Sequence, residues 1–176
     1  LPAIEALARV DTICLDKTGT ITSGKLKVAE TLPMTGQSEA TVTKAAAAIV
    51  YALNDDNETA MAIKAAFQND TNQQVTQTMP FSSARKWSGA VVNGQVLFMG
   101  APQFTFGDQL PAPIANQIKD AAAKGYRVLA IGTATKLVHP LVNPQLLGLI
   151  LITDELRPTA INTFDFFKTQ GVALKV

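Results

Sequence analysis

The chain has 176 residues, of which 47% are hydrophobic and 16% are charged, and its formal net charge is +1. This composition predicts a buried core and excludes a disordered chain, and the balanced charge excludes the basic excess of a nucleic-acid binder. The single cysteine, Cys14, cannot form an internal disulfide, which is typical of a reducing compartment. The N-terminus shows no leader-like pattern, and the longest apolar runs, Ala45–Leu53 and Leu146–Ile152, are shorter than the ~18–20 residues that span a bilayer. We therefore expect a soluble chain that does not cross a membrane.

The N-terminal part of the chain is predicted to contain one strand and then two helices. Residues 1–10 have apolar side chains at helical spacing, which indicates the end of a helix or a lead-in. Val10–Asp16 is short and rich in β-branched residues, as in a buried strand. The next polar segment, Lys17–Lys25, contains two glycines and predicts a loop. The two predicted helices are Glu39–Leu53 and Glu58–Phe67, the second with Asn57 as its N-cap.

The C-terminal part is predicted to begin with a hairpin and to end with a strand. Asn93-Gly94 lies between two apolar runs in Lys86–Gly100, and this dipeptide accepts the positive φ angles of a type I′ turn. The elements that follow are a helix over Pro111–Gly125, strands over Tyr126–Ala134 and Leu146–Asp154, a helix over Arg157–Gly171 and a strand over Val172–Val176.

The two ends of the chain share a character that the middle lacks. Val10–Asp16, Leu146–Asp154 and Val172–Val176 are short apolar strands, which is typical of a parallel sheet covered on both faces. The middle, with its hairpin and separate helices, predicts an antiparallel α+β domain. We therefore expect an α/β domain interrupted by an α+β insert. The expected division is 1–25 and 148–176 for the α/β part and 26–147 for the insert.

Asp16 follows a predicted strand, and ligands of open α/β sheets bind beyond the carboxyl ends of the strands. A carboxylate there can attack phosphorus and form an acyl phosphate. Lys17 can offset phosphate charge, and Thr18, Gly19 and Thr20 offer backbone N–H groups and hydroxyls for phosphoryl oxygens. Such a site needs Mg²⁺, held by one or two carboxylates. The alternative is that Asp16 only opens a turn after the strand.

The segment Asp-Lys-Thr-Gly-Thr-Ile-Thr, residues 16–22, resembles the phosphorylation motif of the P-type ATPases. In that family the first aspartate is phosphorylated by ATP during ion transport. The resemblance implies a partial haloacid-dehalogenase-like Rossmannoid domain with a nucleotide-binding domain inserted after the motif. It implies Asp16, Lys17 and Thr18 as catalytic residues, Asp16 and Thr18 as metal ligands, and ATP and Mg²⁺ as cofactors.

Four further segments resemble the nucleotide-binding region of the same family. They are Asn54–Phe67, Met79–Gly89 with its Phe-Ser-x-x-Arg-Lys stretch, Phe98–Phe104 around Gly-Ala-Pro, and Gly125–Gly132. A fifth, Leu151–Ala160, resembles the hinge that returns to the phosphorylation domain. The resemblance implies a stack of Phe81 on adenine, worth ~1–3 kcal/mol in other base-binding systems. The implied nucleotide-binding residues are Glu58, Phe81, Ser83, Lys86, Gly100, Ala101, Arg127, Asp154 and Arg157.

The sequence also departs from the family pattern. Met99 stands where many members have lysine before Gly-Ala-Pro, and Gln103 stands where they have glutamate, so weaker ATP binding is expected. The motifs that complete the Mg²⁺ site in the family do not occur, nor do its transmembrane helices and actuator domain. We therefore expect a fragment, inactive by itself, of a protein at the cytoplasmic face of the cell membrane. Its expected partners are ATP, a cation bound by transmembrane helices and the rest of the polypeptide, but no nucleic acid.

Two other functions fit parts of the sequence. A soluble phosphatase of the haloacid-dehalogenase type would use residues 26–147 as a cap. Such enzymes usually place a second aspartate two residues after the nucleophile as general acid and base, and here that residue is Thr18. Threonine cannot activate water in this way, so a phosphorylated Asp16 would persist, as a pump requires. The third possibility is a nucleotide-binding module without catalysis.

Overall fold

A computed structural model describes residues 10–68 and 72–176, except for the side chain of Thr18. The predicted helix over residues 1–10 lies almost entirely outside the described residues. The described chain divides into two compact units: residues 10–25 with Asp154–Val176, and Leu26–Thr153. The predicted boundary at residue 147 falls within a continuous strand, so the larger unit extends to Thr153.

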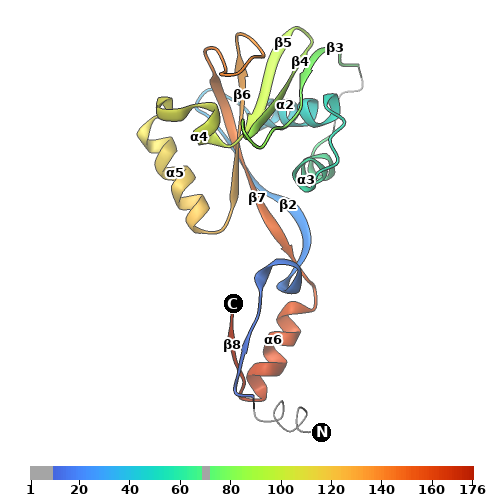
Figure 1. The fold of residues 1–176 in the computed structure, drawn as a ribbon, viewed down its shortest axis with the longest axis vertical. Coiled ribbons are helices and arrows are strands. Elements are labelled where there is room, and N and C mark those ends of the chain that lie inside the picture. Colours follow the sequence, from blue (N-terminus) through green and yellow to red (C-terminus); the bar gives the residue numbers. More distant parts are fainter. Residues whose placement is uncertain (1–9, 69–71) are drawn as a thin grey trace. The chain divides into compact units, whose positions relative to one another are not determined.

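Most expected helices and strands are present (Figure 1). The strands are β1 (Thr12–Cys14), β2 (Thr22–Pro33), β3 (Val75–Met79), β4 (Trp87–Val92), β5 (Gln95–Gly100), β6 (Arg127–Ala134), β7 (Gln145–Leu156) and β8 (Ala173–Lys175). The helices are α2 (Glu39–Ala52), α3 (Glu58–Ala66), α4 (Pro102–Thr105), α5 (Ala112–Ala123) and α6 (Ala160–Thr169), with a π-helix η1 (Lys17–Ile21) and a 3₁₀ helix η2 (Gly107–Gln109).

A six-stranded sheet in the order β2-β7-β6-β5-β4-β3 forms the centre of the larger unit (Figure 1). The pairs from β3 to β7 are antiparallel. The β4–β5 hairpin turns at Asn93 and Gly94, whose φ angles are 50° and 77°, as the Asn-Gly signal predicts. The mixed α/β fold with an antiparallel sheet is therefore confirmed.

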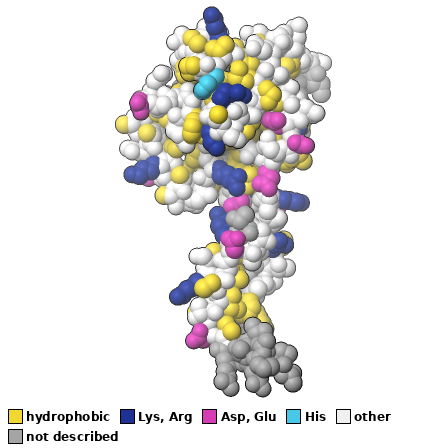
Figure 2. All heavy atoms as spheres, viewed as in Figure 1, with side chains coloured by type: hydrophobic (Ala, Val, Ile, Leu, Met, Phe, Trp, Pro, Cys, Tyr) yellow, Lys and Arg dark blue, Asp and Glu magenta, His cyan; other side chains and the backbone are white. Residues whose placement is uncertain are grey.

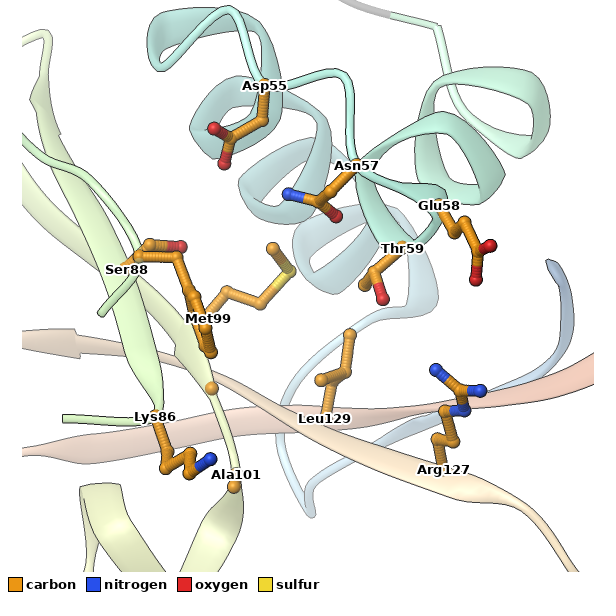
Figure 3. Close-up of a pocket in the computed structure, with 12 residues that line it drawn as sticks. Asp55, Asn57, Glu58, Thr59, Lys86, Ser88, Met99, Ala101, Arg127 and Leu129 are labelled. Carbon is orange, nitrogen blue, oxygen red and sulfur yellow. The ribbon is translucent and has the colours of Figure 1, made fainter. Parts of the chain in front are cut away.

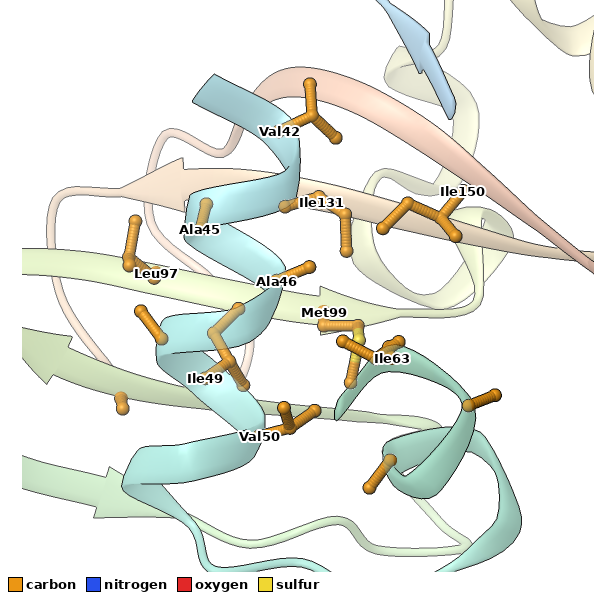
Figure 4. Packing of buried hydrophobic residues seen from close by; sticks show 14 of the residues in the cluster. Val42, Ala45, Ala46, Ile49, Val50, Ile63, Leu97, Met99, Ile131 and Ile150 are labelled. Carbon is orange, nitrogen blue, oxygen red and sulfur yellow. The ribbon is translucent and has the colours of Figure 1, made fainter. Parts of the chain in front are cut away.

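One face of this sheet is covered by α2 and α3. The buried side of α2 is rich in alanine, which lets the helix lie close to the strands, and Val42, Ile49 and Val50 fill the space between them (Figure 4). From the sheet, Leu97 and Ile131 point into the same cluster. Burial of a side chain of this size contributes about 1.5–3 kcal/mol, so this interface is a main source of stability.

The other face is covered by α4, α5 and the segment that follows β6. Trp87 and Phe98 are fully buried there, and Phe106 and Leu137 pack against them. Successive residues of a strand point to opposite faces, so Phe98 lies on this side while its neighbours Leu97 and Met99 lie on the other. The sheet therefore has an apolar core on both faces.

The smaller unit contains β1, η1, α6 and β8, together with the adjoining ends of β2 and β7. β1 pairs with β8 in parallel, with Ile13 opposite Leu174. Helix α6 leads into β8, and the turn between them contains Gly171 at a φ of 74°.

Several expectations about local structure were wrong. The strand expected to be buried within Val10–Asp16 is present as β1, but its residues Thr12 and Cys14 are exposed. Leu146–Asp154 lies in β7 of the antiparallel sheet and not in a parallel sheet. Helices cover both faces of this antiparallel sheet, so β7 has a continuous apolar run like that of a strand in a covered parallel sheet. Lys17–Lys25 is not a loop, because it forms η1 and the start of β2. The sequence reading also missed β3, a strand at the edge of the sheet with mostly exposed side chains.

Candidate functional site

A pocket of about 500 Å³ opens in the larger unit beside the N-terminus of α3. It is bounded by the residues before α3, the segment before β4, the end of β5 and the start of β6 (Figure 3). Its lining residues are Asp55, Asn57, Glu58, Thr59, Phe81, Lys86, Ser88, Met99, Gly100, Ala101, Arg127 and Leu129.

The first turn of α3 builds one wall of the pocket. Asn57 is its N-cap, and the Asn57 side-chain oxygen accepts a hydrogen bond of 3.0 Å from the Ala60 N–H. The cap fixes where the helix begins, and this places Glu58 and Thr59 at the pocket. Figure 3 shows these residues across the pocket from Lys86 and Ala101.

A short loop between β3 and β4 supplies Phe81 and Lys86 from its two ends. Phe81 is 53% exposed, although it is large and apolar. Lys86 has a φ of 59°, which is uncommon for a residue other than glycine and costs of the order of 1–3 kcal/mol. The Lys86 N–H donates to the Ser82 carbonyl at 2.7 Å, and its carbonyl accepts from the Ala101 N–H at 3.0 Å. These bonds hold Lys86 in its strained conformation at the pocket.

Only glycine fits at position 100, because the start of β4 packs directly against it. A Cβ at this position would lie 2.3 Å from the Trp87 Cβ and 2.7 Å from the Lys86 carbonyl oxygen. Gly100 and Trp87 are paired in the β4–β5 ladder. The glycine therefore allows the start of β4, directly after Lys86, to approach the end of β5, directly before Ala101.

The pocket carries charges of both signs around an apolar floor. Its carboxylates are Asp55 and Glu58, its cations are Lys86 and Arg127, and the buried Met99 lies on the floor. Burial raises the pKa of the Asp55 carboxyl above its ordinary value of 3.8; nearby Lys64 opposes this rise, and Asp56 adds to it. A ligand with an anionic end would therefore direct that end toward the cations.

The structure brings several of the predicted nucleotide-binding residues together around this pocket. They are Glu58, Phe81, Lys86, Gly100, Ala101 and Arg127, which come from widely separated parts of the sequence. Ser83 lies in the same loop as Phe81 but is exposed and does not line the pocket. Four other lining residues were not expected from the sequence: Asp55, Thr59, Ser88 and Leu129. Asn57 was expected only as an N-cap. The period-two alternation of β4 and β6 could have indicated Ser88 and Leu129 as residues of one face.

A second group of predicted residues lies in the smaller unit around η1, after β1. Asp16 is exposed at the start of this segment. The Arg157 side chain donates to the carbonyls of Gly19 and Thr22, at 2.7 and 3.1 Å, and its backbone N–H donates to the Ile21 carbonyl. Asp154 forms an ion pair of 3.2 Å with Lys17. Asp154 and Arg157 thus contact the segment after Asp16 and do not line the pocket.

The hydroxyl of Thr22 is also used within this segment. Thr22 is fully buried, and its Oγ1 accepts from the Gly19 N–H at 3.2 Å and lies 3.4 Å from the Lys17 carbonyl oxygen. The Gly19 N–H expected to face a phosphate is therefore engaged inside the segment. The side chain of Thr18, the other predicted metal ligand, lies outside the described part of the structure.

Magnesium prefers oxygen ligands and commonly takes one or two carboxylates together with phosphates and water. Within the described residues, no group of three histidine, cysteine, aspartate or glutamate side chains is arranged to hold a metal ion. One carboxylate, that of Asp16, does not by itself make a metal site. Across residues 10–68 and 72–176, none of the helices has the length and apolarity needed to span a bilayer.

Comparisons with known proteins give consistent relatives. The sequence matches the haloacid dehalogenase-like hydrolase family over residues 10–175. It is 35% identical to a probable cation-transporting ATPase, exp7, of Streptococcus pneumoniae, over 99% of this chain and 23% of that protein. It is 34% identical to the calcium-transporting ATPase CtpE of Mycolicibacterium smegmatis, over 100% of this chain and 22% of that protein. The chain spans about a quarter of the length of these relatives.

Two solved structures share the fold. A zinc-transporting PIB-type ATPase in the E2P state superposes with a TM-score of 0.74 at 26% identity, over 98% of this chain and 26% of that one. The catalytic domain of the CPx-ATPase CopB-B superposes with a TM-score of 0.61 over 99% of this chain and 56% of that one. The second match, at 14% identity, indicates the fold alone.

Proposed function

The chain belongs to the haloacid dehalogenase-like hydrolase family, and we propose that it is the ATP-binding part of a cation-transporting P-type ATPase. Over its whole length it is similar to the nucleotide-binding and phosphorylation region of such ATPases. In the proposed reaction, the larger unit binds ATP and Asp16 of the smaller unit accepts the γ-phosphoryl group. The whole protein would lie in a membrane with this region on its cytoplasmic face.

The pocket beside α3 is the single observation that carries the proposal. It combines an exposed aromatic ring, an apolar floor and two cations within about 500 Å³, a volume that suits a nucleotide. The aromatic face of Phe81 is available for stacking because the side chain is more than half exposed. A base in contact with Phe81 and Met99 would bury apolar surface on both partners, which favours binding.

The charges of the pocket suggest how ATP would be oriented. Lys86 and Arg127 offer N–H donors to phosphate oxygens, and such charge-assisted hydrogen bonds are stronger than neutral ones. Glu58 lies on α3, across the pocket from Lys86, where a carboxylate can accept a hydrogen bond from an exocyclic amino group of the base. The pocket would therefore hold the base near α3 and direct the phosphates toward the cations.

Asp16 is the proposed acceptor. A carboxylate oxygen of Asp16 would attack the γ-phosphorus of ATP while the bond from phosphorus to the bridging oxygen of ADP breaks, which yields an aspartyl phosphate and ADP. The ion pair of Lys17 with Asp154 and the contacts of Arg157 support this role, because they hold the segment after Asp16 in one conformation. Mg²⁺ is proposed to accompany ATP.

Nuclear magnetic resonance of the 176-residue chain tests the nucleotide pocket. Addition of a non-hydrolysable ATP analogue should shift the amide signals of Glu58, Phe81, Lys86 and Ala101 in a saturable manner. Signals of residues at the other end of α2, such as Thr41, serve as the internal control and should not move. The absence of any shift at millimolar analogue would contradict the proposal.

A further inference from the structure

Arg85 lies in the loop between β3 and β4, residues 80–86, which is called the pocket loop below. It makes a contact at each end of this loop but does not line the pocket. Its Nη2 donates to the Pro80 carbonyl at 2.5 Å, directly before Phe81. Its guanidinium carbon lies 5.6 Å from the centre of the Trp87 ring, directly after Lys86. Its Nε is shielded from solvent and has no hydrogen-bond partner among the described residues. The guanidinium thus links Pro80, at the start of the loop, to Trp87, the first residue of β4.

Trp87 gives Arg85 a rigid surface to lie on. Its side chain is fully buried in the core on the α4 and α5 face of the sheet. The indole Nε1 donates to the Nδ1 of His139 at 3.4 Å. His139, coloured cyan in Figure 2, lies on the surface of the larger unit. The indole is therefore held by the core, and it gives the guanidinium that lies over it a fixed position.

The two contacts of Arg85 lie next to Phe81 and Lys86, the pocket residues proposed to bind the base and the phosphates. Phe81 follows the carbonyl that Arg85 holds, and Lys86 is kept in the left-handed region by its bonds to Ser82 and Ala101. A loop that had to order itself on binding would lose affinity through the entropy of ordering. Contacts that fix its two ends in advance remove that loss.

We propose that Arg85 is a positioning residue that sets the separation of the Phe81 ring from the Lys86 ammonium group before nucleotide binds. This inference rests on the proposed function, because it assigns a role within the same pocket. A planar guanidinium can stack on an indole while donating in its own plane to a carbonyl. A lysine ammonium has the same charge but lacks this planar group and carries all its donors on one nitrogen, so charge alone does not reproduce the geometry of Arg85.

The test compares Arg85→Lys and Arg85→Met with the wild-type chain in three measurements. Calorimetry with ATP and with adenosine should show both ligands bound ~3- to 10-fold more weakly by both variants, because preorganisation is lost for base and phosphate alike. Hydrogen exchange in the free protein should be faster at the amides of Lys86 and Ala101. Fluorescence of Trp87, the one tryptophan of the chain, should change because the guanidinium no longer covers it.

Lys119→Met is the matched control, because it removes an exposed cation from α5 at a distance in sequence from the loop. It should leave affinity and exchange unchanged. Weaker ATP binding with unchanged adenosine binding would overturn the inference and indicate a direct phosphate contact. Full affinity in Arg85→Lys would overturn it as well. If the wild-type chain binds neither ligand, the proposed function fails, and unchanged exchange at Lys86 and Ala101 would separately overturn the role of Arg85.

Discussion

Phe81 illustrates how single residues carry the proposed function. A phenylalanine with 53% of its surface exposed gains little from the folded state, but it can gain from burial against a ligand. Lys86 likewise accepts a left-handed backbone that most side chains avoid. An exposed apolar side chain or a strained backbone does not favour the fold, and such features are expected at binding sites. Both residues lie in the Phe-Ser-x-x-Arg-Lys stretch, which is why the sequence could indicate them.

Asp55 supplies a prediction about pH. Burial raises its pKa in the folded protein above the ordinary value of 3.8, so the folded state binds the proton more tightly than the unfolded state does. Its contribution to stability is therefore most favourable below the ordinary pKa and is lost as pH rises from there through the raised pKa. Asparagine does not ionise, so Asp55→Asn does not undergo this loss of stability with rising pH. The unfolding free energy of the variant relative to wild type should rise between about pH 3 and about pH 7.

Urea denaturation followed by Trp87 fluorescence measures this difference at each pH. Comparison of the two proteins at the same pH cancels the contributions of the other carboxylates. A difference that stays constant or falls with rising pH would show that the Asp55 carboxylate does not oppose folding.

The remaining pocket residues show the limit of sequence reasoning at this scale. Motif residues such as Glu58 and Arg127 could be named because they stand at fixed places in recognisable stretches. Ser88 and Leu129 reach the pocket only because β4 and β6 present one face to α3. A strand alternates its side chains, but the sequence does not state which face meets a helix. Arg85 could be read from its motif, whereas its contact with Trp87 required the structure.

At the scale of elements, the two N-caps offer a matched pair. Ser38 caps α2 by accepting from the Thr41 N–H at 3.1 Å, and Asn57 caps α3 by accepting from the Ala60 N–H. Alanine at either position should lower the unfolding free energy by about 1 kcal/mol. Asn57→Ala should also weaken ATP binding, because the first turn of α3 carries Glu58 and Thr59.

Urea denaturation and calorimetry with ATP together test this pair. Ser38→Ala is the control, since it should show the loss of stability without the loss of affinity. Equal effects of the two variants on ATP affinity would mean that the start of α3 does not position pocket residues.

Elements with local signals could be predicted, and elements defined by distant partners could not. The helices α2, α3 and α5 and the β4–β5 hairpin follow from periodicity, caps and the Asn-Gly turn. Strand β2 begins in a polar, glycine-containing stretch, and its neighbour β7 lies more than a hundred residues away. β3 is an edge strand with little burial, so its sequence lacks the apolar alternation of a half-buried strand.

At the scale of the whole molecule, the proposed reaction needs both units of the chain. ATP would bind in the larger unit, and Asp16 belongs to the smaller one. In the intact ATPase, Asp16→Asn should abolish the acid-stable label left by γ-labelled ATP, because an amide cannot form the acyl phosphate. ATP binding should persist, since the pocket is unchanged.

Asp11→Asn is the control for this prediction, because Asp11 is another exposed carboxylate close to β1. It should keep the label. Label retained in Asp16→Asn would mean that a different residue accepts the phosphoryl group.

The central claim, that the pocket beside α3 binds adenine nucleotide by stacking on Phe81, is tested most directly by calorimetric titration of the chain with a non-hydrolysable ATP analogue. Phe104→Ala is the matched control, because Phe104 is also an exposed phenylalanine but does not line the pocket. We predict saturable binding by wild type and Phe104→Ala, and binding weaker by ~1–3 kcal/mol in Phe81→Ala. Equal dissociation constants for all three proteins, or no binding by wild type at millimolar analogue, would contradict the claim.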